Sequence, residues 1–185
     1  MAAPASKTID NLTGRWILNK KLSDSSDPVL ALQGIGFLAR KGINMASITL
    51  DLNQYTALPA PPNMATDTVT HIDITQSPSG KDGQERRCVD NTFREHSTSL
   101  FGPVIGKTMW VSHDEIDDDF LKNGWLVEGE GKFLKIVVQS KGSGWIATQI
   151  WGFEMVDGER RYCRHISVTK GDKRVEVRFV YDFIV

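Results

Sequence analysis

The hydrophobic pattern of the chain changes its period twice near the N-terminus. Apolar and polar positions alternate over residues 14–22, which predicts a first strand. A helix-start signal follows, because Asp27 can cap a helix and Pro28 suits its first position. Two short helices are expected over about residues 27–46, and alternation resumes at Ile48. The sequence therefore predicts a helix–turn–helix inserted between two strands.

Nearly all of the chain beyond these helices alternates, in segments separated by turns rich in Gly and Asp. Strands are expected at residues 48–53, 68–76, 84–96, 106–113, 120–129, 132–142, 144–155, 160–171 and 173–183. With the first strand they number ten. Short hairpins make an antiparallel meander, and closure into a barrel removes its exposed edges. We predict an all-β fold: a ten-stranded antiparallel up-and-down barrel with a helix–turn–helix lid between the first two strands.

Composition and charge restrict the function classes. The chain is 40% hydrophobic and 24% charged, with a net charge of −1. Without an excess of Lys and Arg, nucleic acid is not an expected partner. No apolar run is long enough to span a membrane, and the N-terminus lacks a secretion signal. We therefore expect a cytoplasmic protein of one domain, residues 1–185, with a loose tail at residues 1–11 and with Cys88 and Cys163 as reduced thiols.

The opening stretch resembles the intracellular lipid-binding (fatty-acid-binding) proteins of the calycin superfamily. The resemblance is carried by Gly14-Arg15-Trp16, by the run GIGFLARKGINMASITL and by the C-terminal VRFVYDF. It implies a barrel with an interior cavity for a hydrophobic small molecule. It also implies a portal on the lid, formed by Ile35, Phe37, Leu38, Arg40 and Lys41. Arg40 and Lys41 are then candidates for transient contact with a membrane surface.

The last strand departs from the pattern of this family. By alternation, Val177, Phe179 and Tyr181 point inward and Arg178 points outward. Family members bind a fatty carboxylate with an inward Arg two residues before an inward Tyr, and Phe179 stands at that Arg position. A desolvated carboxylate without a cation is costly. The sequence therefore argues against a fatty acid as the default ligand.

The eighth strand supplies an aromatic face. Gln149, Trp151 and Phe153 share one side of it, with isolated polar groups among the rings. Such a lining suits a bulky, mostly neutral ligand that is lipid-, terpenoid- or polyketide-like. The alternative is that these aromatics only fill the bottom of the barrel. The ligand-binding candidates are Phe37, Leu38, Gln149, Trp151, Phe153, Val177, Phe179 and Tyr181.

Four polar residues are candidates for chemistry. Tyr181 is a candidate hydrogen-bond donor, and an inward Arg164 on the ninth strand would replace the missing cation. Arg94 and His96, placed on the fourth strand, could polarise a carbonyl or move a proton if they face inward. The alternatives are a surface salt bridge for Arg164 and a solvated strand end for Arg94 and His96. No histidine cluster has metal-ligand spacing and no cofactor motif is present, so neither a metal nor a cofactor is expected.

Two functions remain open from the sequence. One is a carrier that binds an apolar small molecule in the barrel cavity. The other is a cofactor-independent enzyme, such as an isomerase, dehydratase or cyclase, that acts on such a molecule in the same cavity. A carrier returns its ligand unchanged, whereas an enzyme does not.

Overall fold

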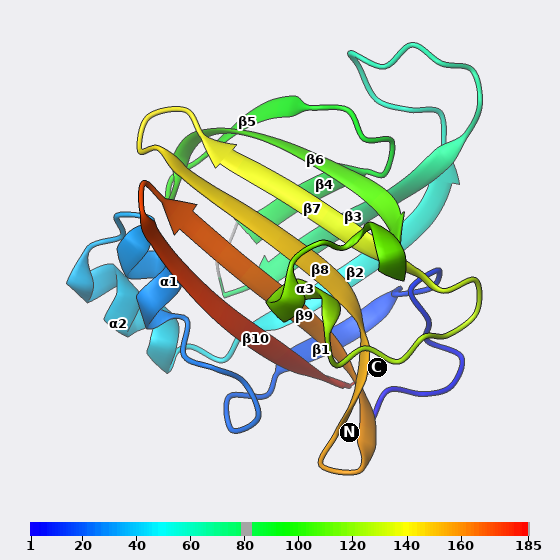
Figure 1. The fold of residues 1–185 in the computed structure, drawn as a ribbon, viewed down its shortest axis with the longest axis horizontal. Helices are drawn as coiled ribbons and strands as arrows, with labels where there is room; N and C mark the ends of the chain where they lie inside the picture. The colour runs from blue at the N-terminus through cyan, green and yellow to red at the C-terminus, as the bar shows by residue number, and fades with distance from the viewer. Residues whose placement is uncertain (79–82, 185) are drawn as a thin grey trace.

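The computed structural model describes residues 1–78 and 83–184, and their strands form one curled antiparallel sheet (Figure 1). Its ten strands follow the order β4-β3-β2-β1-β10-β9-β8-β7-β6-β5. The strands are β1 (Gly14–Leu18), β2 (Thr49–Ala57), β3 (Val69–Ser77), β4 (Gln84–Cys88), β5 (Arg94–Thr98), β6 (Gly102–Ser112), β7 (Lys132–Ser140), β8 (Trp145–Val156), β9 (Glu159–Lys170) and β10 (Lys173–Phe183). The predicted all-β antiparallel meander is therefore confirmed.

The first and last strands lie side by side in this sheet. Trp16 of β1 pairs with Leu50 of β2 on one side and with Phe183 of β10 on the other. The edge strands β4 and β5 share no ladder in the described chain. An isolated parallel bridge between Val89, which follows β4, and Thr108 of β6 links the two ends of the sheet. The sheet thus curls around an interior.

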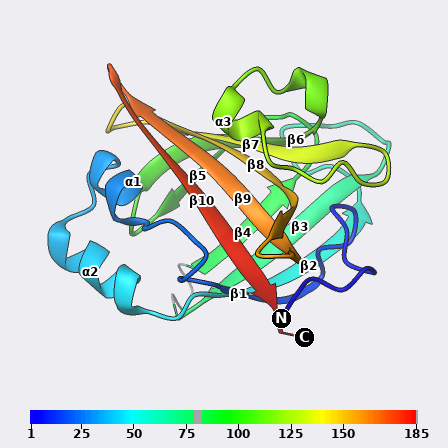
Figure 2. The ribbon, with the colours of Figure 1, turned by 60° about the horizontal axis from the view of Figure 1, so that its bottom comes forward.

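The expected helix pair lies between β1 and β2, at one end of the barrel (Figure 2). Helix α1 (Asp27–Leu32) buries Val29 against the inner side of the strands, whereas α2 (Phe37–Met45) has no buried residue. Pro28 occupies the first turn of α1, where its missing N–H costs no hydrogen bond. The lid is therefore anchored through α1, and α2 stands off from the strands.

Two of the predicted strands are wrong. The segment 84–96 divides into β4 and β5, and Asn91 between them has a positive φ of 58° that interrupts the alternation. The segment 120–129 forms no strand. It contains the end of the short helix α3 (Asp119–Lys122) and a connection to β7. The total of ten strands is right because one missing strand is replaced by one divided strand.

Helical spacing explains the element that replaced the expected strand. Leu121 and Trp125 are both buried and lie four residues apart, and the Asp118 side chain accepts a hydrogen bond from the Leu121 N–H at 3.1 Å. Residues 113–127, here called the outer cap, also include a 3₁₀ turn (His113–Glu115). The cap covers buried residues on the outside of β8, β9 and β10, among them Ile150 and Cys163.

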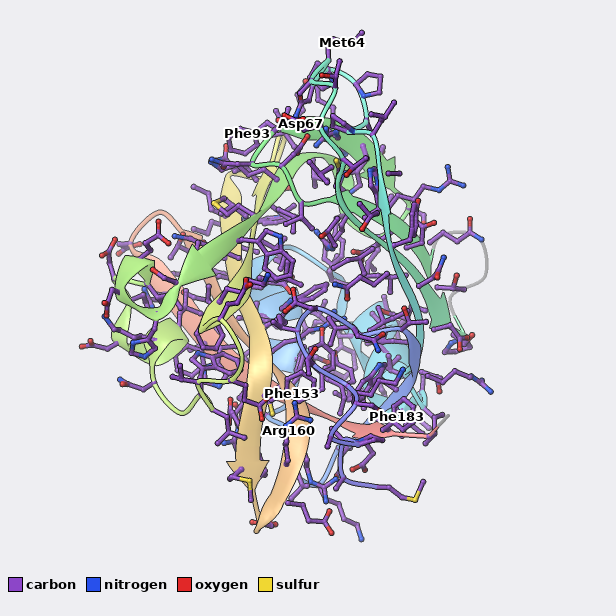
Figure 3. The ribbon with its side chains drawn as sticks, turned by 90° about the vertical axis from the view of Figure 1, so that its right-hand side faces the viewer. Met64, Asp67, Phe93, Phe153, Arg160 and Phe183 are labelled. Carbon is purple, nitrogen blue, oxygen red and sulfur yellow. The ribbon has the colours of Figure 1, made fainter. Side chains whose placement is uncertain are left out.

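The N-terminal segment, predicted as a loose tail, is packed against the barrel. The Ala3 N–H donates to the Arg160 carbonyl at 2.7 Å, and Ile9 and Leu12 are buried. The Leu12 carbonyl accepts from the Trp16 indole at 2.9 Å. The segment orders because its apolar side chains fill the end of the barrel opposite the lid. Figure 3 shows Phe153 and Arg160 side by side at this end, with the Arg160 guanidinium carbon 3.8 Å from the ring centre.

Two apolar clusters occupy the interior. A closed-end cluster includes Trp16, Leu50 and Tyr162, and a lid-end cluster includes Val104, Trp145 and the Val29 side chain of α1. Phe179 and Val138 contact both clusters. The level between the two clusters is where polar side chains reach the interior. Within the described residues, no helix is long and apolar enough to cross a membrane.

Candidate functional site

The inward faces of β8, β9 and β10 bring a cation and several aromatic rings together. Arg164 of β9 is flanked in register by Trp151 of β8 and Phe179 of β10, and Tyr162 of β9 lies beside Tyr181 of β10. Trp151, Tyr162 and Tyr181 belong to the closed-end cluster. The register with Trp151 and Phe179 therefore places Arg164 inside the barrel.

Arg164 is held by aromatic side chains. Its guanidinium carbon lies 3.7 Å from the Trp151 ring centre and 5.2 Å from that of Tyr181. Its Nε donates to the Tyr162 hydroxyl at 2.9 Å. The residue is 8% exposed, and Nη2 has no hydrogen-bond partner in the described part of the chain. The surface salt bridge considered from the sequence is therefore wrong, and a buried cation with an unpaired N–H faces the interior.

The two inner tyrosines remain protonated. Burial raises the pKa of both Tyr162 and Tyr181 above the ordinary value, although the nearby Arg164 opposes the shift. Each hydroxyl is thus a neutral hydrogen-bonding group at neutral pH. The Tyr181 hydroxyl makes no hydrogen bond to any described residue, unlike Tyr162, whose hydroxyl accepts from Arg164.

Gln149 of β8 lies on the same inward face as Trp151 and Arg164. The Trp151 indole N–H donates to its Oε1 at 2.9 Å, which fixes both side chains one strand away from Arg164. Of the other candidates, Val177 lies in the lid-end cluster, Phe179 touches both clusters, and Phe153 lies in the closed-end cluster against Arg160. Phe153 therefore packs toward the closed end of the barrel.

A second interior cation comes from β4. The Arg87 guanidinium carbon lies 5.4 Å from the Trp151 ring centre, although five strands separate β4 from β8 along the sheet. Arg87 forms an ion pair with Glu85, and its charge holds the pKa of Glu85 below the usual range. The register partners of these two residues, Ile72 and Ile74, are buried inward-facing residues of β3.

The sequence analysis missed this pair, because the run QERR resembles a solvated strand edge. The signal that could have found it is parity: Glu85 and Arg87 lie opposite alternate isoleucines of the preceding strand, on the apolar face. Together these inward polar residues make an interior polar belt, defined as Glu85, Arg87, His96, Gln149 and Arg164.

His96 and Arg94, predicted together, have different surroundings. His96 of β5 pairs in register with the buried Val104, and desolvation lowers its pKa, so it is neutral at neutral pH. Arg94 instead binds the Asp90 carboxylate with two nitrogens, each at 2.7 Å, and donates to the Pro61 carbonyl at 3.0 Å. These contacts hold the Arg94 guanidinium at the connection between β2 and β3, so the structure does not bring Arg94 to the belt.

The lid candidates are not brought to the belt. Phe37 and Leu38 lie on α2 and are 66% and 82% exposed. Arg40 pairs with Asp27 at 2.9 Å and donates to the Ile35 carbonyl, which leaves Lys41 as the exposed cation of the portal. Among the residues described, no group of three His, Cys, Asp or Glu side chains is placed to hold a metal ion.

The outer face of β9 carries a separate buried pair. His165 Nε2 lies 2.5 Å from Glu154 Oε1, under the outer cap, and the Phe120 carbonyl lies 2.8 Å from His165 Nδ1. Arg178 reaches the same carboxylate at 3.3 Å from outside, as its parity predicts. Since β9 alternates, this pair and the belt lie on opposite sides of the sheet, and the pair serves the attachment of the cap.

Comparison with known proteins gives two relatives that span the whole chain. "Probable pericyclase scpY" of Mollisia scopiformis is 31% identical over 188 residues, covering 99% of this chain and 95% of that protein. "Pericyclase pydY" of Acremonium sp. is 28% identical over 187 residues, covering 100% of this chain and 97% of that protein. No family model matches the chain.

Solved structures agree on the fold. Fatty-acid-binding protein 1 of Echinococcus granulosus superposes with a TM-score of 0.51 at 13% identity, covering 94% of this chain and 97% of that one. The zebrafish ileal bile acid-binding protein, complexed with cholic acid, gives a TM-score of 0.52 at 10% identity, covering 94% and 98%. The resemblance to the lipid-binding barrels is confirmed at the level of fold.

Proposed function

This chain belongs to the family of "Probable pericyclase scpY" of Mollisia scopiformis and "Pericyclase pydY" of Acremonium sp., and from that premise we propose that it is itself a cofactor-independent pericyclase. Its substrate is a bulky, apolar, unsaturated small molecule held in the barrel interior. The observation that carries the proposal is Arg164, a buried cation with an unpaired Nη2, set among aromatic rings on the inner wall.

The demands of a pericyclic reaction match this interior. Such a reaction moves π and σ electrons around a ring of atoms in one concerted step, so the product has the same atoms as the substrate. No external proton, electron or group is required. The protein must hold the flexible substrate in its reactive conformer, and orientation of this kind lowers the barrier by several kcal/mol.

Arg164 adds polarisation to orientation. A carbonyl conjugated to a reacting double bond becomes more electrophilic when it accepts a hydrogen bond from a cation, and a preorganised donor in a site shielded from water is most effective. The Trp151 ring at 3.7 Å and the Tyr162 hydroxyl at 2.9 Å fix the guanidinium before substrate binds. Tyr181, whose ring centre lies 5.2 Å from the same guanidinium carbon, is neutral and supplies a second donor for that carbonyl.

The product of incubation with a suitable substrate tests the proposal against the carrier alternative. The substrate is a neutral linear polyene that ends in an α,β-unsaturated ketone, and liquid chromatography with mass spectrometry follows it. We expect an isomer of unchanged mass to form faster than with heat-denatured protein. Recovery of unaltered substrate after saturable binding would contradict catalysis and support a carrier.

We also propose that the protein works in the cytoplasm and takes up its substrate beside α2, with Lys41 making transient contact with membrane surfaces. The absence of buried residues in α2 supports a mobile entrance, and Lys41 is its exposed cation. Sedimentation with phosphatidylserine vesicles tests the contact. Lys41→Glu should reduce the bound fraction relative to wild type, and an equal fraction would contradict the contact.

A further inference from the structure

The interior polar belt has an uncompensated charge. Arg87 and Arg164 are two guanidinium groups, and Glu85 is the one carboxylate among the belt residues. Arg87 keeps Glu85 ionised by lowering its pKa, while desolvation keeps His96 neutral. The described belt therefore holds one net positive charge, in an interior that also contains two apolar clusters. A charge in such surroundings is costly without a partner.

Unpaired donors lie on both sides of the interior. Arg87 Nε and Arg164 Nη2 are buried and have no hydrogen-bond partner within the described residues. They come from β4 and β9, and both guanidinium carbons lie over the Trp151 ring, at 5.4 and 3.7 Å. The Trp151 ring thus contacts two cationic donors that come from different parts of the sheet, Arg87 of β4 and Arg164 of β9.

The Glu85 carboxylate, which pairs with Arg87, is accessible. The Glu85 side chain is 44% exposed, although its register partner Ile74 is buried on the same face. The pairing with Ile74 turns Glu85 toward the interior, and Arg164 is a second cation that lowers its pKa. A polar group of a ligand can therefore reach the belt without displacing the closed-end cluster.

We propose that Arg87 and Arg164 together form a subsite for a delocalised oxyanion, such as a carboxylate or an enolate, at one end of an otherwise apolar substrate. Both unpaired donors then gain charge-assisted hydrogen bonds, and the net charge of the belt is neutralised. Glu85 acts as a positioning residue that holds Arg87 over Trp151 and prevents it from turning toward solvent. The inference rests on the proposed function in so far as it concerns the substrate of the same site.

Binding of a matched pair of fluorescent polyenes tests the subsite without turnover. The probes are cis-parinaric acid and its methyl ester, compared at about pH 8, well above the ordinary pKa of a carboxyl group. Wild type should bind the acid about tenfold more tightly than the ester, the effect of a hydrogen bond to a charged group. Arg87→Met should remove this preference and leave the affinity for the ester unchanged.

Controls separate the subsite from loss of structure. Arg86 is the neighbouring residue on β4, exposed on the opposite face, so Arg86→Met should keep the preference for the acid. Arg87→Lys should keep part of it, because the charge remains without the planar fork. Ester affinity in each variant reports an intact cavity.

The outcomes distinguish the two proposals. Equal affinities of wild type for acid and ester, or an equal loss of both in Arg87→Met, would overturn the subsite. If wild type then still isomerises the neutral polyene ketone, the pericyclase proposal stands without the subsite. If wild type prefers the acid but isomerises nothing, the subsite stands and the pericyclase proposal fails.

Discussion

Arg87 of β4 and Trp151 of β8 meet across the barrel interior, with 5.4 Å between the guanidinium carbon and the indole ring centre. Five strands lie between them along the sheet, so this contact exists only because the sheet curls. The same indole ring carries Arg164 at 3.7 Å. One aromatic side chain therefore fixes two cations that the sequence places far apart.

Replacement of Trp151 should disturb both cations together. Trp151→Phe keeps an aromatic face, whereas Trp151→Leu keeps bulk without one. Each cation–π contact of a desolvated guanidinium contributes about 2 kcal/mol, so the Leu variant should lose at least tenfold in turnover of the polyene ketone. The Phe variant should retain most of the activity. Equal turnover in the two variants, with cooperative unfolding intact in both, would contradict a role for the ring face.

Arg164 should matter more for rate than for binding. Arg164→Met removes the donor but keeps an unbranched apolar side chain, so apolar contacts with the substrate persist. By analogy with the removal of one preorganised oxyanion donor, kcat should fall about 100-fold. KM for the neutral ketone should change little. Steady-state kinetics separate the two parameters, and a rise in KM at constant kcat would place Arg164 in ground-state binding alone.

Alternation predicted the inner wall well because β8, β9 and β10 are long and continuous. The inward faces of Phe179 and Tyr181 and the outward face of Arg178 follow from a period of two. Alternation alone leaves Arg164 open between the interior and a surface salt bridge, and its register with Trp151 decides for the interior. The helix pair was predictable for a similar reason, since Pro28 and the change of period mark its start.

The remaining parts depend on contacts that a local pattern does not contain. Residues 84–96 are charged, and only pairing with β3 shows that Glu85 and Arg87 face inward. Asp90 forms an ion pair with Arg94 across a turn, and no spacing rule predicts this pair. The N-terminal segment is short and polar on average. Leu12 is nevertheless fully buried, because it packs in the apolar cluster at the end of the barrel opposite the lid.

The tyrosine side chains should lose their protons at higher pH in the native protein than in the unfolded chain. Burial raises the pKa of Tyr162 and Tyr181, and the pKa of Tyr55 is raised by desolvation and by Asp73. Absorbance at the tyrosinate band should therefore rise at higher pH in the native protein than the ordinary tyrosine pKa of about 10 would give. The urea-unfolded chain should titrate normally at that pH.

The same shifts determine the alkaline stability. A raised folded-state pKa means that, above the unfolded pKa, the unfolded chain releases protons that the native protein retains. The free energy of unfolding should thus be unaffected by these groups below about pH 10 and fall as pH rises beyond it. Tyr181→Phe should make this fall shallower in urea titrations. Ionisation of all three tyrosines of the native protein at the same pH as in the unfolded chain would contradict the buried positions of Tyr162 and Tyr181.

The outer cap depends on a glycine in β8. A Cβ added at Gly152 would lie 2.9 Å from Trp125 Cε3 and 2.9 Å from Phe133 Cδ1, closer than carbon atoms pack. Gly152→Ala should therefore push the cap outward and destabilise the protein by about 1–3 kcal/mol, the usual cost of overpacking. Gly142→Ala is the matched control, because an added Cβ there meets no atom within 4 Å. Urea unfolding monitored by tryptophan fluorescence measures both variants. Because the cap packs outside the sheet, acid-over-ester selectivity for parinaric probes should survive in folded Gly152→Ala, and its loss would show that the cap controls the interior belt.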